Sequence, residues 1–101
     1  HDDVWRDGGL RIDFGTFQAT RRGQRLALTA TEFKLLKALY QDRGRTVPME
    51  QLLQRVWGRD VFLTDRVVYT HINNLRSKIE SDPASPTLIV GVRGIGYRFA
   101  G

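Results

Sequence analysis

Residues 64–80 (TDRVVYTHINNLRSKIE) constrain the fold of this chain most strongly, because their apolar positions recur at helical spacing. An α-helix turns by about 100° per residue, so positions three and four apart lie on one face. The apolar residues on that face are Val68, Ile72, Leu75 and Ile79. A narrow stripe of this kind is typical of a helix packed on a hydrophobic core. We therefore predict a single long helix with one buried face.

The opposite face of this predicted helix carries hydrogen-bonding side chains and no acidic residue. Its members are Arg66, Thr70, Asn73, Asn74 and Ser77. A helix face that is only exposed to solvent usually combines Lys with Glu, because such i,i+4 pairs stabilise the helix. Asn and Arg, in contrast, can form bidentate hydrogen bonds with adenine and guanine in the major groove of DNA. Taken alone, the face fits a solvated helix and a DNA-reading helix equally well.

Length, charge and composition narrow the possible classes of protein. The 101 residues suffice for one hydrophobic core, and no apolar run approaches the roughly 18 residues of a membrane span. With 16 Lys and Arg against 11 Asp and Glu, the net charge of +5 favours a polyanionic partner such as nucleic acid over a membrane surface. The chain has no cysteine, which excludes disulfides and fits a reducing cytoplasm. We expect one soluble, cytoplasmic domain spanning residues 1–101.

The two histidines, His1 and His71, are too far apart in the sequence to form a metal-ligand motif. We therefore expect neither a metal nor another cofactor. The first residue is not Met, which indicates a processed or excised fragment whose neighbouring domain is missing.

Three or four short antiparallel strands are predicted ahead of the first helix, at residues 4–6, 10–14, 17–21 and 24–28. Apolar and polar residues alternate in these runs, and glycine-containing turn signals separate them. Gly23 supplies the positive φ that a tight hairpin turn needs. The basic cluster Arg21, Arg22 and Arg25 either solubilises the hairpin tip, which is the favoured interpretation, or contacts a phosphate backbone.

Two further helices are predicted between this sheet and the long helix. Thr29 and Glu32 have the spacing of a capping box, in which each side chain accepts a hydrogen bond from the backbone of the other. The first helix therefore begins at Thr29 and continues to about residue 42. Pro48 suits the first turn of a second helix, predicted at residues 49–57 and ended by Gly58.

A β-hairpin with an arginine near its tip is predicted after the third helix, with strands at residues 87–90 and 96–99 and a turn at residues 91–95. Gly94 and Gly96 allow a sharp turn and a close approach of the backbone to another surface, so Arg93 projects on a thin arm. The negative potential of a narrow minor groove attracts an inserted arginine. The alternative is a solvated charge at a hairpin tip.

An N-terminal antiparallel sheet, three helices and a C-terminal hairpin together predict an α+β winged helix-turn-helix. In helix-turn-helix proteins the recognition helix lies in the major groove, and an earlier helix crosses the DNA backbone. The polar and basic outer face of the third helix agrees with this use. We therefore expect sequence-specific binding of double-stranded DNA.

Two other classes of function compete with this prediction. An enzyme is disfavoured because the chain shows no Ser-His-Asp, Cys-His or paired-carboxylate arrangement, and Gly94 and Gly96 lie in a hairpin where no phosphate-cradling loop is expected. The second class is a winged helix that docks on a protein without reading DNA, which fold alone does not exclude. Such a module should carry an apolar or acidic outer face on its third helix.

Four motifs follow one another along the chain: LTATEFKLL at residues 28–36, QLL with VWG at residues 51–58, HINNLRSKI at residues 71–79 and VRGIGYRF at residues 92–99. In this order they resemble the OmpR/PhoB-type effector domains of bacterial two-component response regulators. The resemblance covers nearly the whole chain and implies the same sheet, three helices and wing. It also implies transcription regulation under the control of a phosphorylated receiver domain, absent from this chain, and of a sensor kinase.

By position, the resemblance implies that eight residues contact DNA: Arg66, Thr70, His71, Asn73, Asn74 and Arg76 on the third helix, and Arg93 and Tyr97 on the wing. Those assigned mainly to phosphates, which set the register without reading sequence, are Arg66, His71, Arg76 and Tyr97. Asn73 and Asn74 are the candidates for reading adenine, and each bidentate contact would discriminate by ~1 to 3 kcal/mol.

Three positions differ from the family pattern, and a fourth allows two interpretations. Asn73 and Asn74 stand where relatives carry arginines, and Gly91 stands where a threonine commonly precedes the Val-Arg-Gly of the wing. One wing contact of the family is therefore in question here. His71 lies at the flank of the apolar stripe by helical angle, so a packed histidine is as good an interpretation as a phosphate donor.

The resemblance further implies that residues 58–64 contact RNA polymerase, with Arg59, Val61 and Phe62 as the exposed part of that contact. From the residues alone, the apolar side chains of this loop either pack back into the core or form a docking patch for a partner. The isolated domain is expected to be a monomer in solution and to pair head to tail on promoter direct repeats.

Overall fold

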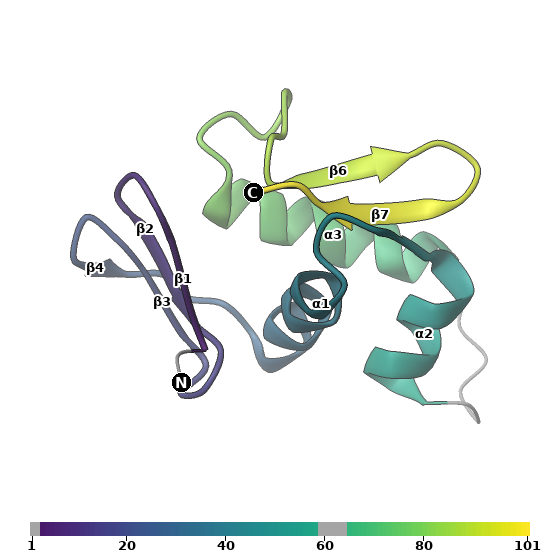
Figure 1. Cartoon of the computed structure of the whole chain (residues 1–101), viewed down its shortest axis with the longest axis horizontal. Helices are drawn as coiled ribbons and strands as arrows, with labels where there is room; N and C mark the ends of the chain where they lie inside the picture. Colours follow the sequence, from purple (N-terminus) through teal and green to yellow (C-terminus); the bar gives the residue numbers. More distant parts are fainter. Residues whose placement is uncertain (1–2, 59–64) are drawn as a thin grey trace.

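The computed structural model of the chain describes residues 3–58 and 65–101. Its elements are β1 (Val4–Asp7), β2 (Leu10–Asp13), β3 (Gln18–Arg21), β4 (Gln24–Arg25), α1 (Ala30–Gln41), β5 (Thr46–Pro48), α2 (Met49–Trp57), α3 (Asp65–Ile79), β6 (Ile89–Val92) and β7 (Gly96–Phe99). The N-terminal sheet lies on one side of the helices, and the β6–β7 hairpin lies along α3 (Figure 1). The predicted order of an antiparallel sheet, three helices and a hairpin is confirmed.

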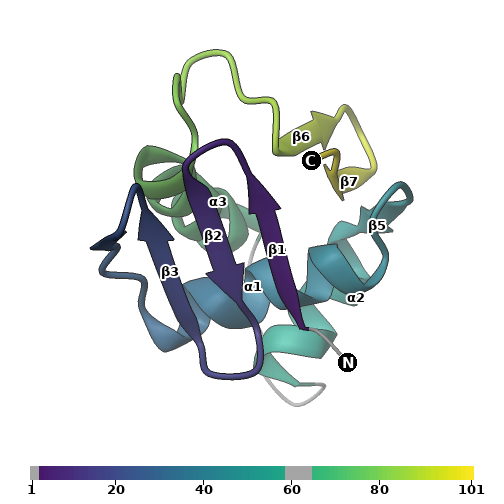
Figure 2. The same cartoon turned by 60° about the vertical axis from the view of Figure 1, so that its left-hand side comes forward.

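The N-terminal sheet has the strand order β1-β2-β3-β4, with every neighbouring pair antiparallel. Its inner face buries Leu10, Ile12 and Ala19, and Figure 2 shows the sheet covering α1. The strand predicted at residues 17–21 begins one residue later, because Phe17 has a positive φ of 56° and lies in the turn. The strand predicted at residues 24–28 is only two residues long. The Leu26 amide still donates to the Ala19 carbonyl, and beyond Leu26 the chain leaves β3.

The capping box predicted at the start of α1 is confirmed. The Glu32 amide donates to Thr29 Oγ1 at 3.1 Å, and the Thr29 amide donates to Glu32 Oε1 at 2.8 Å. These two bonds satisfy backbone donors that the first helical turn leaves without partners. Glu32 is buried and also accepts a hydrogen bond from Lys78 Nζ of α3 at 2.7 Å, so the cap of α1 is joined to α3.

Helix α3 confirms the predicted long helix, although it ends at Ile79, one residue before the predicted end at Glu80, and Thr64 lies outside the described residues. Its apolar stripe is fully buried, and it packs against α1 and α2. The helix ends at Ile79, whose carbonyl accepts a hydrogen bond from Arg21 Nη2 of β3. Arg21 therefore belongs to the contact between the sheet and α3, in contrast to its predicted place in an exposed cluster with Arg22 and Arg25.

The hairpin belongs to a three-stranded sheet with the order β5-β7-β6. The short strand β5 is an addition to the predicted fold. Pro48, predicted in the first turn of α2, is instead the N-cap residue of α2. β5 passes so close to β7 that a Cβ built on Gly96 would lie 2.0 Å from the Val47 carbonyl oxygen. Glycine at position 96 therefore permits this strand pairing.

The first strand of the hairpin lies two residues further along than predicted. Glu80, directly after α3, accepts hydrogen bonds from the amides of Thr87, Leu88 and Ile89. All three amides are thereby bound to one side chain, and pairing with β7 begins only at Ile89, opposite Phe99. Gly91, predicted in the turn, is consequently a strand residue.

Candidate nucleic-acid interface

Helix α3 presents the predicted polar face to solvent. Arg66, Thr70, Asn73, Asn74 and Ser77 are all exposed, directly opposite the buried apolar stripe. Thr70 Oγ1 donates to the Arg66 carbonyl at 3.0 Å, and Ser77 Oγ donates to the Asn74 carbonyl at 2.6 Å. The two hydroxyl protons are thus bound to the helix backbone. The donors that this face offers to a ligand belong mainly to Arg66 and to the two asparagine amides.

The tip of the hairpin is a tight turn at residues 93–95, in which the Ile95 amide donates to the Val92 carbonyl at 3.0 Å. Gly94 has a φ of 78°, a left-handed conformation that glycine adopts without strain. Arg93 and Ile95 are both exposed, and Ile95 retains 54% of its accessible surface. The turn therefore offers one cation and one apolar side chain to a partner, in agreement with the predicted placement of Arg93.

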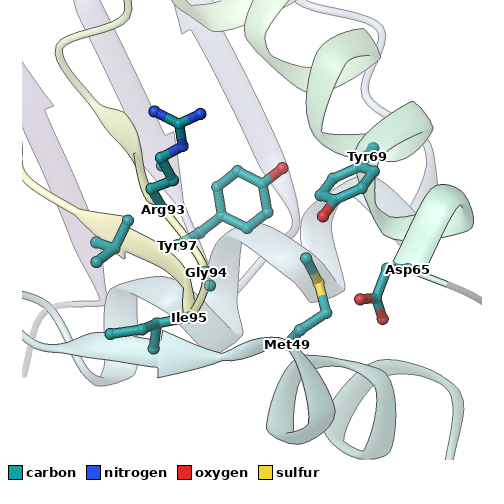
Figure 3. Close-up of a pocket in the computed structure, with 10 residues that line it drawn as sticks. Met49, Asp65, Tyr69, Arg93, Gly94, Ile95 and Tyr97 are labelled. Atoms are coloured by element: carbon teal, nitrogen blue, oxygen red, sulfur yellow. The ribbon is translucent and has the colours of Figure 1, made fainter.

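A groove of about 450 Å³ separates the tip of the hairpin from the first turns of α3 and α2. Tyr69 from α3 and Tyr97 from β7 lie on facing sides of it, with Met49 and Asp65 close by (Figure 3). The two rings meet edge to face with their centroids 6.4 Å apart. The groove thus lies between the first turn of α3 and Arg93, which also lines it.

Tyr69 is a residue of this surface that the sequence analysis missed. Tyr69 is 47% exposed, although large aromatic residues usually contribute to a core. The available signal was its position: Tyr69 lies off the apolar stripe and four residues before Asn73, so it shares the exposed side of the helix. Because Tyr69 belongs neither to the apolar stripe nor to the predicted polar face, no role was predicted for it from the sequence.

Tyr97 is only 8% exposed, and its surroundings change the chemistry of its phenol. Burial raises the pKa of Tyr97 above its ordinary value, while the nearby Arg76 acts in the opposite direction. The phenol therefore stays protonated at neutral pH. Most of the ring is packed, so any contact with a ligand is limited to the edge that lines the groove.

Arg76 is half-buried and bound within the protein. Its Nε and Nη2 donate to the Ile89 carbonyl at 3.1 and 2.8 Å, and its guanidinium lies 5.4 Å from the centroid of the Tyr97 ring. This position differs in environment from that of Arg66, whose side chain is exposed on the same helix. These intramolecular contacts compete with the predicted phosphate contact of Arg76.

His71 is also half-buried, with its ring centroid 5.4 Å from that of Trp57 on α2. Of the two interpretations of this histidine, the geometry favours the packed one. The residues expected to contact RNA polymerase, Arg59, Val61 and Phe62, lie outside the described residues. The structure therefore brings together Arg66, Thr70, Asn73 and Asn74 on one helix face and places Arg93 at the far side of the groove.

Among residues 3–58 and 65–101, no three His, Cys, Asp or Glu residues gather in a way that could hold a metal ion. Within the same ranges, no helix is long and apolar enough to cross a membrane. What the described surface offers is thus a polar helix face, an arginine at a hairpin tip and a groove between them.

Comparison with known proteins supports an interpretation of this surface. A family model described as "Transcriptional regulatory protein, C terminal" matches residues 23–99. The chain is 39% identical over 100 residues to the sensory transduction protein RegX3 of Mycobacterium tuberculosis, covering 99% of this chain and 44% of that protein. It is 46% identical over 90 residues to the transcriptional regulatory protein BaeR of Escherichia coli, covering 89% of this chain and 38% of that protein. The chain thus spans less than half the length of these curated relatives.

Solved structures of transcriptional response regulators also resemble this chain. The response regulator DrrB of Thermotoga maritima, an OmpR/PhoB homologue, superposes with a TM-score of 0.88 at 35% identity, over 98% of this chain and 45% of that one. The DNA-binding domain of RstA from Klebsiella pneumoniae, solved in complex with the RstA box, superposes with a TM-score of 0.81 at 31% identity, over 96% of both chains.

Proposed function

The chain belongs to the OmpR/PhoB-type family of transcriptional regulator effector domains, and from this premise we propose that it binds double-stranded DNA with sequence specificity as the output domain of a two-component response regulator. The observation that carries the proposal is the exposed, acid-free face of α3 beside a hairpin tipped by Arg93. In the proposed complex a DNA backbone passes between the start of α3 and the hairpin tip, from the major groove to the adjacent minor groove.

In the proposed complex α3 lies in the major groove. Asn73 and Asn74 read base edges, with adenine as the expected partner of an asparagine amide. Arg66 lies near the start of the helix and contacts a phosphate, and the oxygen of Thr70 can accept a hydrogen bond beside it. These assignments are supported by the exposure of all four side chains.

In the same complex Arg93 enters the minor groove at the flank of the site, where narrow A/T-rich sequence has the most negative potential. The protonated phenol of Tyr97 is available as a hydrogen-bond donor to a phosphate at the groove edge. For His71 we propose a packing role against Trp57.

The partners of the full-length protein follow from family membership and are part of the proposal. They are a receiver domain, a cognate sensor kinase and RNA polymerase, which we expect to contact the segment containing Arg59, Val61 and Phe62. We further propose that the isolated domain is monomeric and that two copies bind head to tail on promoter direct repeats.

The proposal is tested by selecting bound sequences from a pool of random duplex DNA at two salt concentrations. We expect an ordered motif, relaxed at particular bases by Asn73→Ala or Asn74→Ala and at an A/T flank by Arg93→Ala. The matched control is Gln18→Ala, an exposed amide on β3 of the N-terminal sheet, which should leave the motif unchanged. A lack of any enriched motif, together with retention that is insensitive to salt, would favour the protein-docking alternative.

A further inference from the structure

We propose that Arg76 is a positioning residue that holds the wing hairpin against α3, so that it influences DNA binding through Arg93 and makes no phosphate contact of its own. The part of this inference that concerns DNA rests on the proposed function. The part that concerns the hairpin is a property of the free protein.

The first observation is the hydrogen bonding of Arg76. Its Nε and Nη2 both donate to the carbonyl of Ile89, the first residue of β6, at 3.1 and 2.8 Å. A planar guanidinium can present two parallel donors to one acceptor, whereas the ammonium of lysine cannot reproduce that fixed geometry. The Nε–Nη2 edge of the guanidinium is therefore already occupied by the wing, which leaves the Nη1 end for any other acceptor.

The second observation is that the same guanidinium touches the other wing strand. It lies 5.4 Å from the centroid of the Tyr97 ring, which belongs to β7. Tyr97 is paired across the hairpin with Gly91, and a Cβ built on Gly91 would lie 3.7 Å from the Tyr97 ring and 3.8 Å from Arg76 Nη2. Arg76 is thus packed beneath this pair, and Arg93 follows only two residues after Gly91.

The third observation is that Ile89 is held from both sides of its peptide unit. Its carbonyl binds Arg76, and its amide donates to Glu80 Oε2 at 2.9 Å. Arg76 and Glu80 are themselves one helical turn apart, and the Glu80 amide donates to the Arg76 carbonyl at 2.9 Å. The end of α3 therefore fixes where β6 starts, and with it the distance from α3 to the turn that carries Arg93.

A phosphate contact and a positioning role make different predictions for Arg76→Lys. Lysine retains the charge that a phosphate needs but loses the two parallel hydrogen bonds to Ile89. The probe is the duplex enriched by the selection described above, titrated with wild type, Arg76→Lys, Arg93→Ala and the double variant at several salt concentrations. For the positioning role we expect Arg76→Lys to weaken binding by about tenfold and to lose the A/T preference at the flank, without a change in the salt slope.

The double variant measures the coupling between the two substitutions in DNA affinity. A general loss of structure would not produce such a coupling. If Arg76 acts through Arg93, then Arg76→Lys should weaken binding much less in the Arg93→Ala background than in wild type. The proposal is overturned if the two effects are additive. It is also overturned if Arg76→Lys binds like wild type while Arg76→Met lowers the salt slope by about 0.9, the value for one neutralised phosphate.

A measurement without DNA separates this proposal from the proposed function. Amide hydrogen exchange should become faster in β6 and β7 of Arg76→Lys, while β1, β2 and β3 keep the wild-type rates. The matched control is Arg55→Lys, because Arg55 also donates to a backbone carbonyl, that of Ala38, but lies away from the wing. Faster exchange over the whole chain, or unchanged exchange in β6 and β7, would overturn the positioning role even in a protein that binds DNA. Faster exchange confined to the wing would support it even if no DNA were bound.

Discussion

Lys78 on α3 donates to the buried Glu32 carboxylate at 2.7 Å, and the same carboxylate belongs to the capping box of α1, where it accepts from the amide of the N-cap residue Thr29. One carboxylate thus completes the N-terminus of one helix and holds another helix in place. The side chain of Glu32 is 3% exposed, so the loss of a partner leaves a buried negative charge with fewer hydrogen bonds.

We expect Lys78→Ala to lower the free energy of unfolding by about 1–3 kcal/mol, because it removes the partner of a buried carboxylate. The measurement is urea denaturation followed by circular dichroism. Lys34→Ala, which removes an exposed lysine of α1, is the control and should change stability by less than about 0.5 kcal/mol. Equal effects of the two variants would show that the contact between Lys78 and Glu32 does not stabilise the fold.

Two glycines of the wing should respond oppositely to alanine. Gly96→Ala places a methyl group where the Val47 carbonyl lies, so we expect a loss of at least about 1–3 kcal/mol of stability. Gly91→Ala makes only ordinary contacts in a strand without a positive φ, so it should be neutral or stabilising by up to about 1 kcal/mol. Thermal unfolding of both variants decides the matter, and a stable Gly96→Ala protein would contradict the observed approach of β5 to β7.

The raised pKa of Tyr97 predicts a pH dependence of stability at alkaline pH. Because burial raises this pKa above the ordinary value of 10.0, the folded protein holds the phenol proton more tightly than the unfolded chain does. The corresponding stability is complete below the unfolded pKa and is lost as the pH rises through the folded pKa. As the pH rises above about 10, the wild type should therefore lose more stability than Tyr97→Phe. Parallel stability curves for the two proteins would exclude this effect.

Arg66→Ala should weaken DNA binding almost uniformly across sequences and lower the salt slope by about 0.9, because an exposed arginine near the start of α3 is assigned to one phosphate. Asn73→Ala is the comparison, since it should change base preference and leave the slope unaltered. Titrations of one duplex at four salt concentrations measure both. A change of base preference without a change of slope in Arg66→Ala would assign it to base reading instead.

The parts of the fold that the sequence predicted well are those with local signals. The stripe from Val68 to Ile79 repeats at helical spacing, so both the long helix and its buried face could be inferred without any knowledge of its neighbours. The capping box of Thr29 and Glu32 is equally local, because the two residues satisfy each other within one turn.

The parts that could not be predicted depend on contacts between distant residues. Strand β5 has only three residues, ends in Pro48 and becomes a strand only because β7 lies beside it. The shift of β6 arises in the same way, because Glu80 binds amides seven to nine residues further along the chain. No periodicity within either segment carries this information.

The candidate site was likewise predicted only where the signal in the sequence is local. The exposed face of α3 and the tip arginine Arg93 were predicted from spacing and turn residues. The intramolecular contacts of Arg76 were not, because the side of α3 covered by the wing is fixed only when the hairpin docks. The exposure of Tyr69 was missed, although its position off the apolar stripe indicated it. Helical angle alone cannot distinguish an arginine that meets a ligand from one that meets a neighbouring strand.

The pairing of β5 with β7 joins Thr46 to Arg98, from opposite halves of the chain. During synthesis, α2 and its preceding strand therefore leave the ribosome long before the strand that completes their sheet. A nascent chain that stops ahead of Gly96 can build the capped helix α1 but cannot close the wing. Completion of the fold thus requires translation to pass β7, so chains terminated before that strand lack the closed wing.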